Sequence, residues 1–375
     1  MQIIGFRQVP VGWRMLARDR IRFAITLAGV GVAVALMLFL AAVYEGVRTE
    51  SNGYVEGRPV DVWIAQGNAT NLVRSSSFLS TVRWGRLNRA DGVASLHPLL
   101  RLVTTLKVNG RVFTAFVCGV DPDAPATHPA IVEGPGTLHK GEIIIDWALA
   151  KRAGLRVGDP LFVQGRAYRV SGISSGTNVI ISQFTFVALD DAQELLGMPN
   201  VVSFLLVTGR PGVTPQTLSA TLRHAAPELN VFTADEFITN NLDELRTGLL
   251  PILATIAVFG AVIGAAVVTL LLYGAILERR EDYAVLKAIG ANAAYIRLLV
   301  LRQSIATVAC GFAAGLLLYA VSQPVIASLV PIFVTALTPM SFTAIGGAVM
   351  VMGTIGALIP LARLERIHPA EAFRP

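Results

Sequence analysis

Long runs without charge constrain this chain most. Between Arg22 and Glu45 no charged residue occurs over 22 positions, and about 20 apolar residues suffice to cross a hydrocarbon core of about 30 Å. Two further charge-free stretches run from Thr247 to Leu277 and from Gln303 to Ala362. With a mean hydropathy of +0.60 and only 15% charged residues, a substantial part of the chain belongs in lipid.

The last charge-free stretch is too long for one span and is interrupted by polar residues and prolines, namely Gln323, Pro324, Pro331, Thr338 and Pro339. Two spans are therefore expected there. The predicted division is transmembrane helices at 23–44, 248–277, 298–321 and 341–362, a large segment 45–247, a loop 278–297, a short loop 322–340, and terminal segments 1–22 and 363–375. A cleaved signal peptide is the alternative for the first run, but its apolar region would be only about 7 to 15 residues long.

Basic residues predict the orientation of the spans. Three segments that flank the spans carry 13 of them: Arg7, Arg14, Arg18, Arg20, Arg22, Arg279, Arg280, Lys287, Arg297, Arg302, Arg363, Arg366 and Arg374. By the positive-inside rule these segments face the cytoplasm, so both termini lie inside and 45–247 lies outside. The net charge of +6 then arises from the basic residues of the cytoplasmic segments, and nucleic acid is not an expected partner.

The segment before the first span has an apolar face, with Phe6, Val9 and Trp13, and an arginine face. This pattern predicts a cytoplasmic amphipathic helix over 1–22 that lies on the inner leaflet. Positive-inside anchoring explains the arginines equally well, so both interpretations stay open.

The outer segment alternates strand and helix patterns. A strand is expected at 60–65, and residues 102–121 form two strands joined by Asn109-Gly110, a strong hairpin signal. Residues 141–155 suggest a strand and a short helix that Gly154 ends. Strands are also expected in VGDPLFV, AYRVSGI and IISQFTFVAL, a short helix in DDAQELLG, and a strand-helix-strand unit from VVSFLLVTG through 215–226 to LNVFTA. The predicted fold is a four-helix membrane protein with an inserted α+β extracytoplasmic domain of two subdomains.

Asp235 to Arg246 lacks glycine and proline. It is expected to form a helix that continues without a break into the second span, and Glu45 to Val55 is the corresponding stretch after the first span. Both are candidate stalks that connect the outer domain rigidly to the membrane, whereas a flexible connector would be richer in such breakers.

Small residues recur four apart at Gly260 and Gly264 and at Gly311 and Gly315. This spacing lets membrane helices approach closely, either within the chain or in a dimer. Apart from Arg302, near the start of the span 298–321, no Asp, Glu, Lys, Arg or His lies inside a predicted span. Because ion and proton pathways usually contain such residues, an ion-coupled carrier is disfavoured.

Several motifs resemble catalytic signatures without their context. Gly172 to Gly176 matches G-x-S-x-G around Ser174, but the following Thr-Asn-Val-Ile-Ile favours a strand where a nucleophile elbow requires a helix. Gly29-Val30-Gly31 lies within a span, where no nucleotide binds. The five histidines and the cysteines Cys118 and Cys310 show no metal-ligand spacing, so no metal is expected. The chain has no P-loop, and any nucleotide energy would come from another polypeptide.

The loop after the second span, from Glu278 to Asn292, is the sharpest positive signal. It has charges at its front, an apolar stripe of Ala284, Val285, Ala288 and Ile289, and a glycine stop at Gly290. Taken alone, it is a short juxtamembrane helix.

These features together resemble the MacB/FtsX family of ABC permeases. ERREDYAVLKAIGAN is similar to that family's loop after the second span, and PLARLERIHPAEAFRP is similar to its C-terminal motif. The outer sequences GEIIIDWALAKRAGLRVGDPLFV and ALDDAQELLG resemble the family's periplasmic core, and the opening WRMLARDRIRFAITLAGVGVAVALMLF resembles the DevC-like branch.

The resemblance implies a bacterial inner-membrane permease that lacks the fused ATPase of MacB itself. ATP and magnesium would be bound by a separate ATPase subunit, and this chain would be non-catalytic and without a cofactor. A second permease copy, in a homo- or heterodimer, and a periplasmic adaptor or lipoprotein are further implied partners. The implied ATPase-coupling residues are Glu278, Arg279, Arg280, Glu281, Tyr283, Leu286, Lys287, Ala288 and Gly290, whereas the substrate-binding residues are unknown.

Two functions follow from the resemblance. The first is ATP-driven export or extraction of a hydrophobic or envelope-derived substrate by mechanotransmission, in which substitution of Lys287 or Gly290 would reduce ATPase stimulation. The second is an FtsX-like relay that activates a cell-wall hydrolase without transport. A third class, a membrane-anchored hydrolase, would require that Ser174→Ala alone abolish activity.

Overall fold

The computed structural model describes residues 20–50, 52–179, 182–278, 280–331 and 334–364. It contains two compact units: a membrane unit of Met1–Glu45, Ile252–Ile326 and Thr335–Pro375, and an outer unit of Gly46–Pro251 and Ala327–Val334. The predicted amphipathic helix over 1–22 lies outside the described residues as far as residue 19, as does the predicted tail from residue 365 onward.

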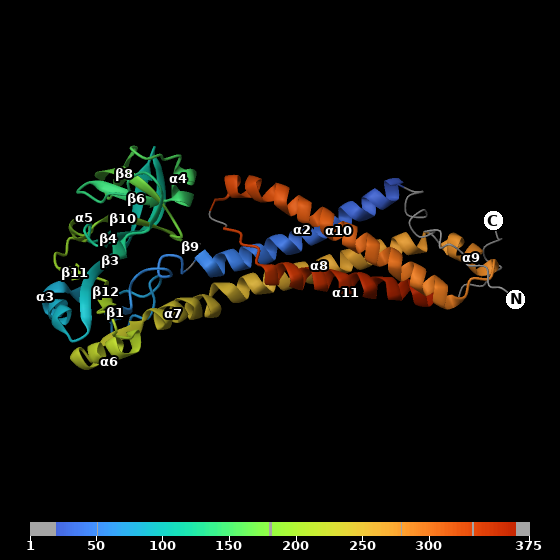
Figure 1. Ribbon diagram of the computed structural model, residues 1–375. Helices are drawn as coiled ribbons and strands as arrows, with labels where there is room; N and C mark the ends of the chain where they lie inside the picture. Colours follow the sequence, from blue (N-terminus) through green and yellow to red (C-terminus); the bar gives the residue numbers. More distant parts are fainter. Residues whose placement is uncertain (1–19, 51, 180–181, 279, 332–333, 365–375) are drawn as a thin grey trace. The chain divides into compact units, whose positions relative to one another are not determined.

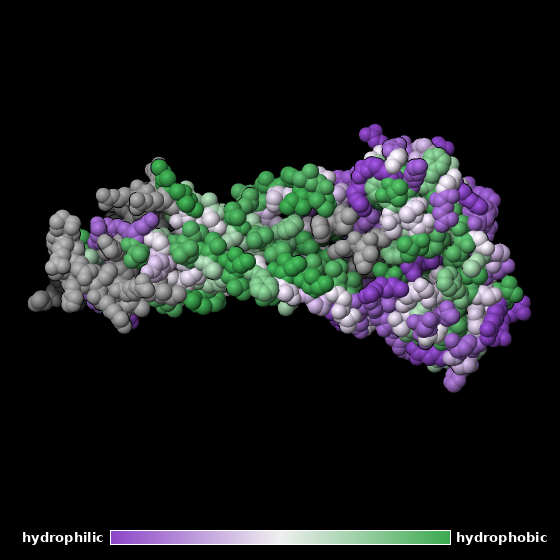
Figure 2. All heavy atoms as spheres, turned by 180° about the vertical axis from the view of Figure 1, so that it is seen from behind, coloured by the Kyte–Doolittle hydropathy of each residue, from purple (hydrophilic) through white to green (hydrophobic). Residues whose placement is uncertain are grey.

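Four long helices are apolar enough to cross a membrane, which confirms the predicted number among the described residues. They are α2 (Arg20–Glu50), α8 (Leu249–Leu277), α10 (Ala293–Leu329) and α11 (Pro339–Leu364), and a short helix α9 (Arg280–Ala288) precedes α10. Figure 1 shows the four long helices side by side, and all four contribute side chains to one buried apolar cluster. Their outer surface is also largely hydrophobic (Figure 2), as lipid requires.

The first helix extends beyond its predicted span of 23–44. α2 continues through Glu45 and Arg48 to Glu50, and the chain then turns over residues 52–57. The predicted stalk Glu45 to Val55 is therefore helical only in its first part. A charged side chain ends the hydrophobic span but does not end the helix. Once a helix has formed, each further residue adds a backbone hydrogen bond and only that residue's conformation has to be fixed.

The predicted break at Pro324 is wrong, since α10 runs through this proline to Leu329. Proline removes one backbone donor, and the flanking turns carry the helix past it. The predicted loop 322–340 is correspondingly shorter. α11 begins at Pro339, two residues before its predicted start, because the Thr338 hydroxyl accepts from the Ser341 amide at 3.1 Å, and proline is favoured in a first helical turn.

The four predicted packing glycines all lie at helix contacts within this chain. A Cβ on Gly311 would lie 2.3 Å from Val30 Cγ1, and one on Gly315 would lie 2.8 Å from the Gly31 carbonyl oxygen, so α10 has room only for glycine where it meets α2. On α8, a Cβ on Gly260 would meet Leu40 at 2.4 Å and one on Gly264 would meet Met37 at 2.2 Å. These glycines thus let α2 pack closely between α8 and α10.

The outer unit is built on one mixed sheet, in which the strand order among the described residues is β13-β1-β12-β3-β4-β10-β6-β8-β5. These strands are β1 (Val62–Gln66), β3 (Val93–Val108), β4 (Arg111–Val120), β5 (Ala130–Glu133), β6 (Glu142–Asp146), β8 (Arg166–Ser175), β10 (Ser182–Ala188), β12 (Phe204–Gly209) and β13 (Leu229–Thr233), with β7 (Pro160–Val163) and β9 (Asn178–Val179) off this path. Strands β2 (Leu79–Ser80) and β11 (Val201–Val202) pair separately.

The helices of the outer unit are α3 (Thr81–Trp84), α4 (Trp147–Ala153), α5 (Leu189–Leu196), α6 (Pro215–Ala225) and α7 (Ala234–Thr247), with 3-10 turns η1 (Gly85–Arg89) and η2 (Pro125–Thr127). An α+β insert was expected, and the structure confirms it. The predicted hairpin is also confirmed: β3 and β4 pair from Leu99↔Val120 to Val108↔Arg111, and Asn109 and Gly110 both have positive φ, as a type I′ turn needs.

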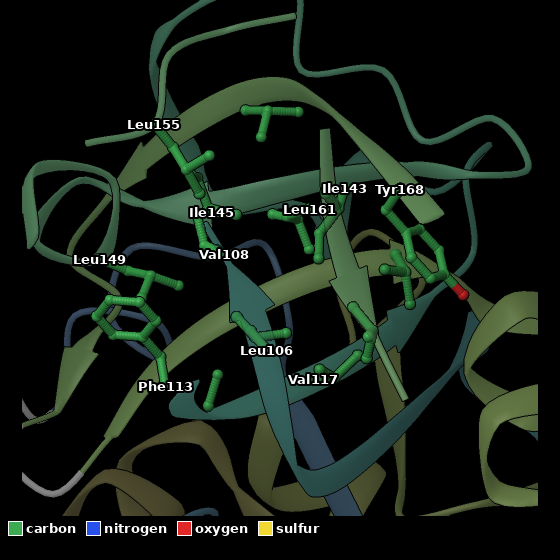
Figure 3. Close-up of a cluster of buried hydrophobic side chains, with 14 of the residues drawn as sticks. Leu106, Val108, Phe113, Val117, Ile143, Ile145, Leu149, Leu155, Leu161 and Tyr168 are labelled. Atoms are coloured by element: carbon green, nitrogen blue, oxygen red, sulfur yellow. The ribbon is translucent and has the colours of Figure 1, made fainter. Parts of the chain in front are cut away.

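Two subdomains were predicted for the outer segment, but one continuous sheet runs through both halves of the outer unit. The long strand β3 pairs with β12 through its first half and with β4 and β7 through its second. What is divided is the core: one cluster centred on Leu106, Ile143 and Leu161 fills the β4–β8 half (Figure 3), and others lie around Trp63 and around Val62. β3 therefore joins two packed halves into one unit.

Strand β1, in the half of the sheet that pairs with β12 and β13, is apolar at successive positions because both of its faces are covered. Trp63 and Ala65 face an aromatic cluster with Phe204 and Phe237, whereas Val62 and Ile64 face the cluster under α6. Successive residues of a strand point to opposite faces, so a strand that is covered on both sides is apolar at every position.

We predict that Gly315→Ala lowers the stability of the detergent-solubilised protein by about 1 to 3 kcal/mol, the usual cost of overpacking a tight contact. The added carbon would meet a backbone oxygen at 2.8 Å, which cannot move as a flexible side chain does. Thermal unfolding measures the change.

Gly274→Ala is the matched control, because no atom of a neighbouring element lies within 4 Å of its added carbon. Alanine is favoured over glycine in a helix by about 1 kcal/mol, so this variant should be as stable as the wild type or more so. Equal melting temperatures for the two variants would contradict the close contact of α2 and α10.

Candidate functional site

The helix α9 occupies the centre of the predicted coupling loop 278–297. Glu281 and Asp282 lie in its first turn and Lys287 in its last, an arrangement that complements the helix macrodipole. Of the predicted coupling residues, Arg279 lies outside the described residues and Arg280 begins the helix.

One side of α9 is buried against the membrane unit. Tyr283 is 3% exposed and packs with Leu286 in a cluster formed by Ile296, Leu299 and Val300 of α10, Ile276 of α8 and Ala357 of α11. Tyr283 therefore anchors the helix and is not on its free surface.

The other side of α9 is exposed. Val285 is 48% and Ile289 76% exposed, and Glu278, Glu281, Ala288 and Gly290 are exposed with them. The predicted apolar stripe is thus divided: Ala284, at 6% exposed, faces inward, because neighbouring residues of a helix point about 100° apart. Exposed apolar side chains on an otherwise anchored helix are typical of a surface that contacts another protein or the membrane.

The turn from α9 to α10 is fixed by its backbone. Gly290 has a φ of +100°, a conformation that favours glycine, and the Ala291 amide donates to the Leu286 carbonyl at 3.0 Å. The Asn292 side chain then caps α10 by accepting from the Tyr295 amide at 2.8 Å. The predicted glycine stop therefore ends α9 and begins a tight corner.

The sequence did not indicate the polar partner of Tyr283. Its hydroxyl donates to Gln303 Oε1 at 2.7 Å, and Gln303 is itself only 7% exposed. The available signal was that Gln303 is an amide at the start of an apolar run, where a polar side chain requires a partner.

The predicted stalk at Asp235 to Arg246 is the helix α7, but it is not continuous with α8. α7 ends at Thr247, and Gly248, at φ −106° and ψ −83°, separates it from α8. At its start, a capping box between Thr233 and Glu236 satisfies the first amides.

Buried contacts fix α7 to the sheet of the outer unit. The ring of Phe237 stacks on that of Trp63, with centroids 4.6 Å apart and planes 10° apart. Further along, Asn241 Oδ1 accepts from the Leu72 amide at 2.8 Å, and the Asn52 side chain donates to the Ile238 carbonyl at 3.3 Å. Residues 234–241 therefore move with the sheet and not independently of it.

Ser174, the centre of the G-x-S-x-G match, is a buried strand residue with no exposed surface. Its hydroxyl shares a hydrogen bond with Thr177 at 2.9 Å, and Thr177 Oγ1 donates to Asp146 Oδ2 at 2.7 Å. The described residues directly after it, 175–179, form no helix, and its buried hydroxyl is not accessible from the surface. The geometry argues against a nucleophile elbow, as the sequence predicted.

Asp146 ends β6 and caps α4, where its Oδ1 accepts from the Ala148 amide at 2.8 Å. The side chain is completely buried. Burial raises the pKa of Asp146 to about 6, although hydrogen bonds from Thr177 and from backbone amides favour the charged form.

We predict that Asp146 contributes stability at low pH that is lost as the pH rises from about 4 to 6. The folded protein retains this proton to a higher pH than the unfolded chain does, so folding is favoured below the ordinary pKa of aspartate. A shift of about two pKa units corresponds to about 3 kcal/mol. Asp146→Asn should therefore show a smaller difference in melting temperature between pH 4.5 and pH 6.5 than the wild type.

The control is Asp190→Asn, which alters an exposed aspartate in the first turn of α5. It should retain the pH dependence of the wild type. Identical pH profiles for Asp146→Asn and the wild type would show that Asp146 carries no such proton.

A cleft of about 760 Å³ beside α5 is lined by charged residues that include His139, Lys140, Asp191 and Glu194. Lys140 pairs with Glu194 at 3.0 Å, and Asp191 accepts from the Gly141 amide at 2.8 Å. Lys140 and Glu194 thus neutralise each other and Asp191 is bound by a backbone amide, so the cleft by itself identifies no substrate site. Within the described residues, no group of three or more His, Cys, Asp or Glu is placed to hold a metal ion.

Comparison with known proteins places both parts of the chain. Residues 23–225 match the MacB-like periplasmic core domain, and residues 254–369 match the FtsX-like permease C-terminal domain. An uncharacterized ABC transporter permease of Mycobacterium tuberculosis is 24% identical over 94% of this chain and 95% of its own length. The macrolide export ATP-binding/permease protein MacB of Nitrobacter winogradskyi is 23% identical over 96% of this chain and 58% of its own length.

Among solved structures, the periplasmic region of MacB from Actinobacillus actinomycetemcomitans is 15% identical, with a TM-score of 0.38, over 47% of this chain and 91% of that one. The first domain match alone covers more than half of the 375 residues. The chain therefore belongs to the MacB/FtsX family of ABC transporter permeases, cell-membrane proteins that work with an ATPase.

Proposed function

We propose that this protein is the non-catalytic permease subunit of an ATP-driven complex that exports or extracts a hydrophobic or envelope-derived compound. A separate ATPase subunit binds ATP and magnesium and docks on α9. One observation carries the proposal: α9 is anchored by buried Tyr283 and Ala284 on one side and exposes Val285 and Ile289 on the other. A helix of this kind can transmit a partner's movement to the membrane unit.

The distribution of basic residues supports the orientation that docking requires. Arg280, Lys287, Arg297 and Arg302 lie in and just after α9, and the positive-inside rule assigns such segments to the cytoplasm. With four spans, both termini are then cytoplasmic and the outer unit is extracytoplasmic.

The contacts of α7 support mechanotransmission. Its first eight residues are bound to the rest of the outer unit through Phe237, which stacks on Trp63 of β1, and through Asn241, which accepts from Leu72, so a displacement of α7 displaces the outer unit. α8 contains no charged residue, and buried ionisable side chains of the kind that line ion pathways are absent from it. Work done on the outer unit therefore fits this chain better than passage of a polar substrate between its helices.

The surface of α8 suits lipid or a second permease copy. Its exposed apolar side chains recur every three or four residues, at Ile252, Ile256, Phe259, Ile263, Val267 and Leu270. Gly260 and Gly264 face α2 within the same chain, so a dimer would use the exposed stripe. An adaptor or lipoprotein would contact the outer unit.

We predict that Val285→Asp lowers stimulation of the partner ATPase about tenfold, because a charge placed in an apolar docking surface costs about 1.4 kcal/mol or more of binding free energy. The measurement is ATPase activity of the co-expressed complex, reconstituted in proteoliposomes.

Val112→Asp is the matched control, since Val112 is 64% exposed on β4 of the outer unit. It should leave ATPase stimulation unchanged. Equal stimulation in the two variants would remove the docking assignment. A complex that hydrolyses ATP and activates a cell-wall hydrolase, yet moves no lipid or drug, would favour the signal relay over export.

A further inference from the structure

Tyr283 and Gln303 are joined by a hydrogen bond between two buried side chains. The hydroxyl of Tyr283 and Oε1 of Gln303 are 2.7 Å apart, and the residues are 3% and 7% exposed. Tyr283 also packs in an apolar cluster with Ile276, Ile296, Leu299, Val300 and Ala357. A hydrogen bond in such surroundings is costly to break, because neither group finds water instead.

This bond and the corner at Gly290 hold α9 at two points. Tyr283 lies in the first half of α9, whereas the Ala291–Leu286 and Gly290–Lys287 backbone bonds close its end. Gln303 lies ten positions into α10, beyond the Asn292 cap. A helix fixed at one end can swing about that end, but a helix fixed at two points moves with its neighbour.

We propose that Gln303 is a positioning residue that, through the hydroxyl of Tyr283, clasps α9 onto α10, so that a movement imposed on α9 is passed to α10 as a rigid body. The inference rests on the proposed docking of an ATPase on α9. It adds a second route of transmission to the one through α8 and α7, because α10 is one continuous helix of 37 residues.

The hydrogen bond between Tyr283 and Gln303 fixes the position of α9 on α10 more than it stabilises the fold. Phenylalanine and leucine would fill the same apolar site, and replacing both members of a buried hydrogen bond by apolar groups of similar shape is often nearly neutral for stability. The double variant Tyr283→Phe/Gln303→Leu should therefore fold like the wild type and yet leave α9 free to swing about its end at Gly290. If the pair only stabilised the fold, a variant that keeps the stability of the wild type would also keep α9 in place.

The first measurement uses the full-length permease alone, in nanodiscs. Spin labels are placed at Val285 on α9 and Leu317 on α10, which are 48% and 66% exposed, in a Cys310→Ala background, while Cys118 is buried. The distance distribution should be narrow in this background and clearly broader in Tyr283→Phe and in the double variant, at an unchanged melting temperature for the double variant. Unchanged distributions would overturn the clasp.

The second measurement is ATPase stimulation in the complex with the co-expressed ATPase. Tyr283→Phe and Gln303→Leu should each lower it about threefold, the factor that one net hydrogen bond supplies, and the double variant should be no worse than either. If Val285→Asp abolishes stimulation while the clasp variants retain it, the clasp does not transmit and docking stands. If Val285→Asp is also without effect, the proposed function itself fails.

Discussion

The close approach of α2 to α10 is the contact on which the membrane unit depends. Between helices in lipid there is little hydrophobic driving force, so association rests on dispersion contacts and on how closely backbones can approach. The Cβ position of Gly315 is 2.8 Å from the Gly31 carbonyl oxygen, which leaves no space for any side chain. The outer unit follows α2 in the chain and includes Ala327–Val334 at the end of α10, so both helices of this contact continue into it.

In the outer unit, the long strand β3 holds the two halves of the sheet together. β3 pairs with β12 along its first half and with β4 along its second, so two separately packed cores share a hydrogen-bonded backbone. α7 joins this unit through the stacked rings of Phe237 and Trp63. A connecting helix that shares its aromatic core with a sheet transmits displacement, because a packed interior is not readily compressed.

The role of a polar residue in this protein depends on its burial and on its hydrogen-bond partner. Ser174 lies in a G-x-S-x-G pattern, yet it is buried on β8 and bonded to Thr177. Gln303 belongs to no motif, yet it is the partner of Tyr283 within an apolar cluster. A pattern of residue types does not contain the exposure or the partner of a side chain, and both properties decide what chemistry or mechanics is available to it.

The sequence by itself determined the four spans, the α+β insert, the Asn109-Gly110 hairpin and the position of α9, because charge-free length, strand alternation and turn residues are local properties. It also identified the glycines at 311 and 315, but not the helix that they face. Only the tertiary structure decided that α10 continues past Pro324, that Gly248 separates α7 from α8, and that α9 turns Tyr283 inward and Val285 outward. Those outcomes depend on contacts between residues far apart in the chain, and no local pattern encodes them.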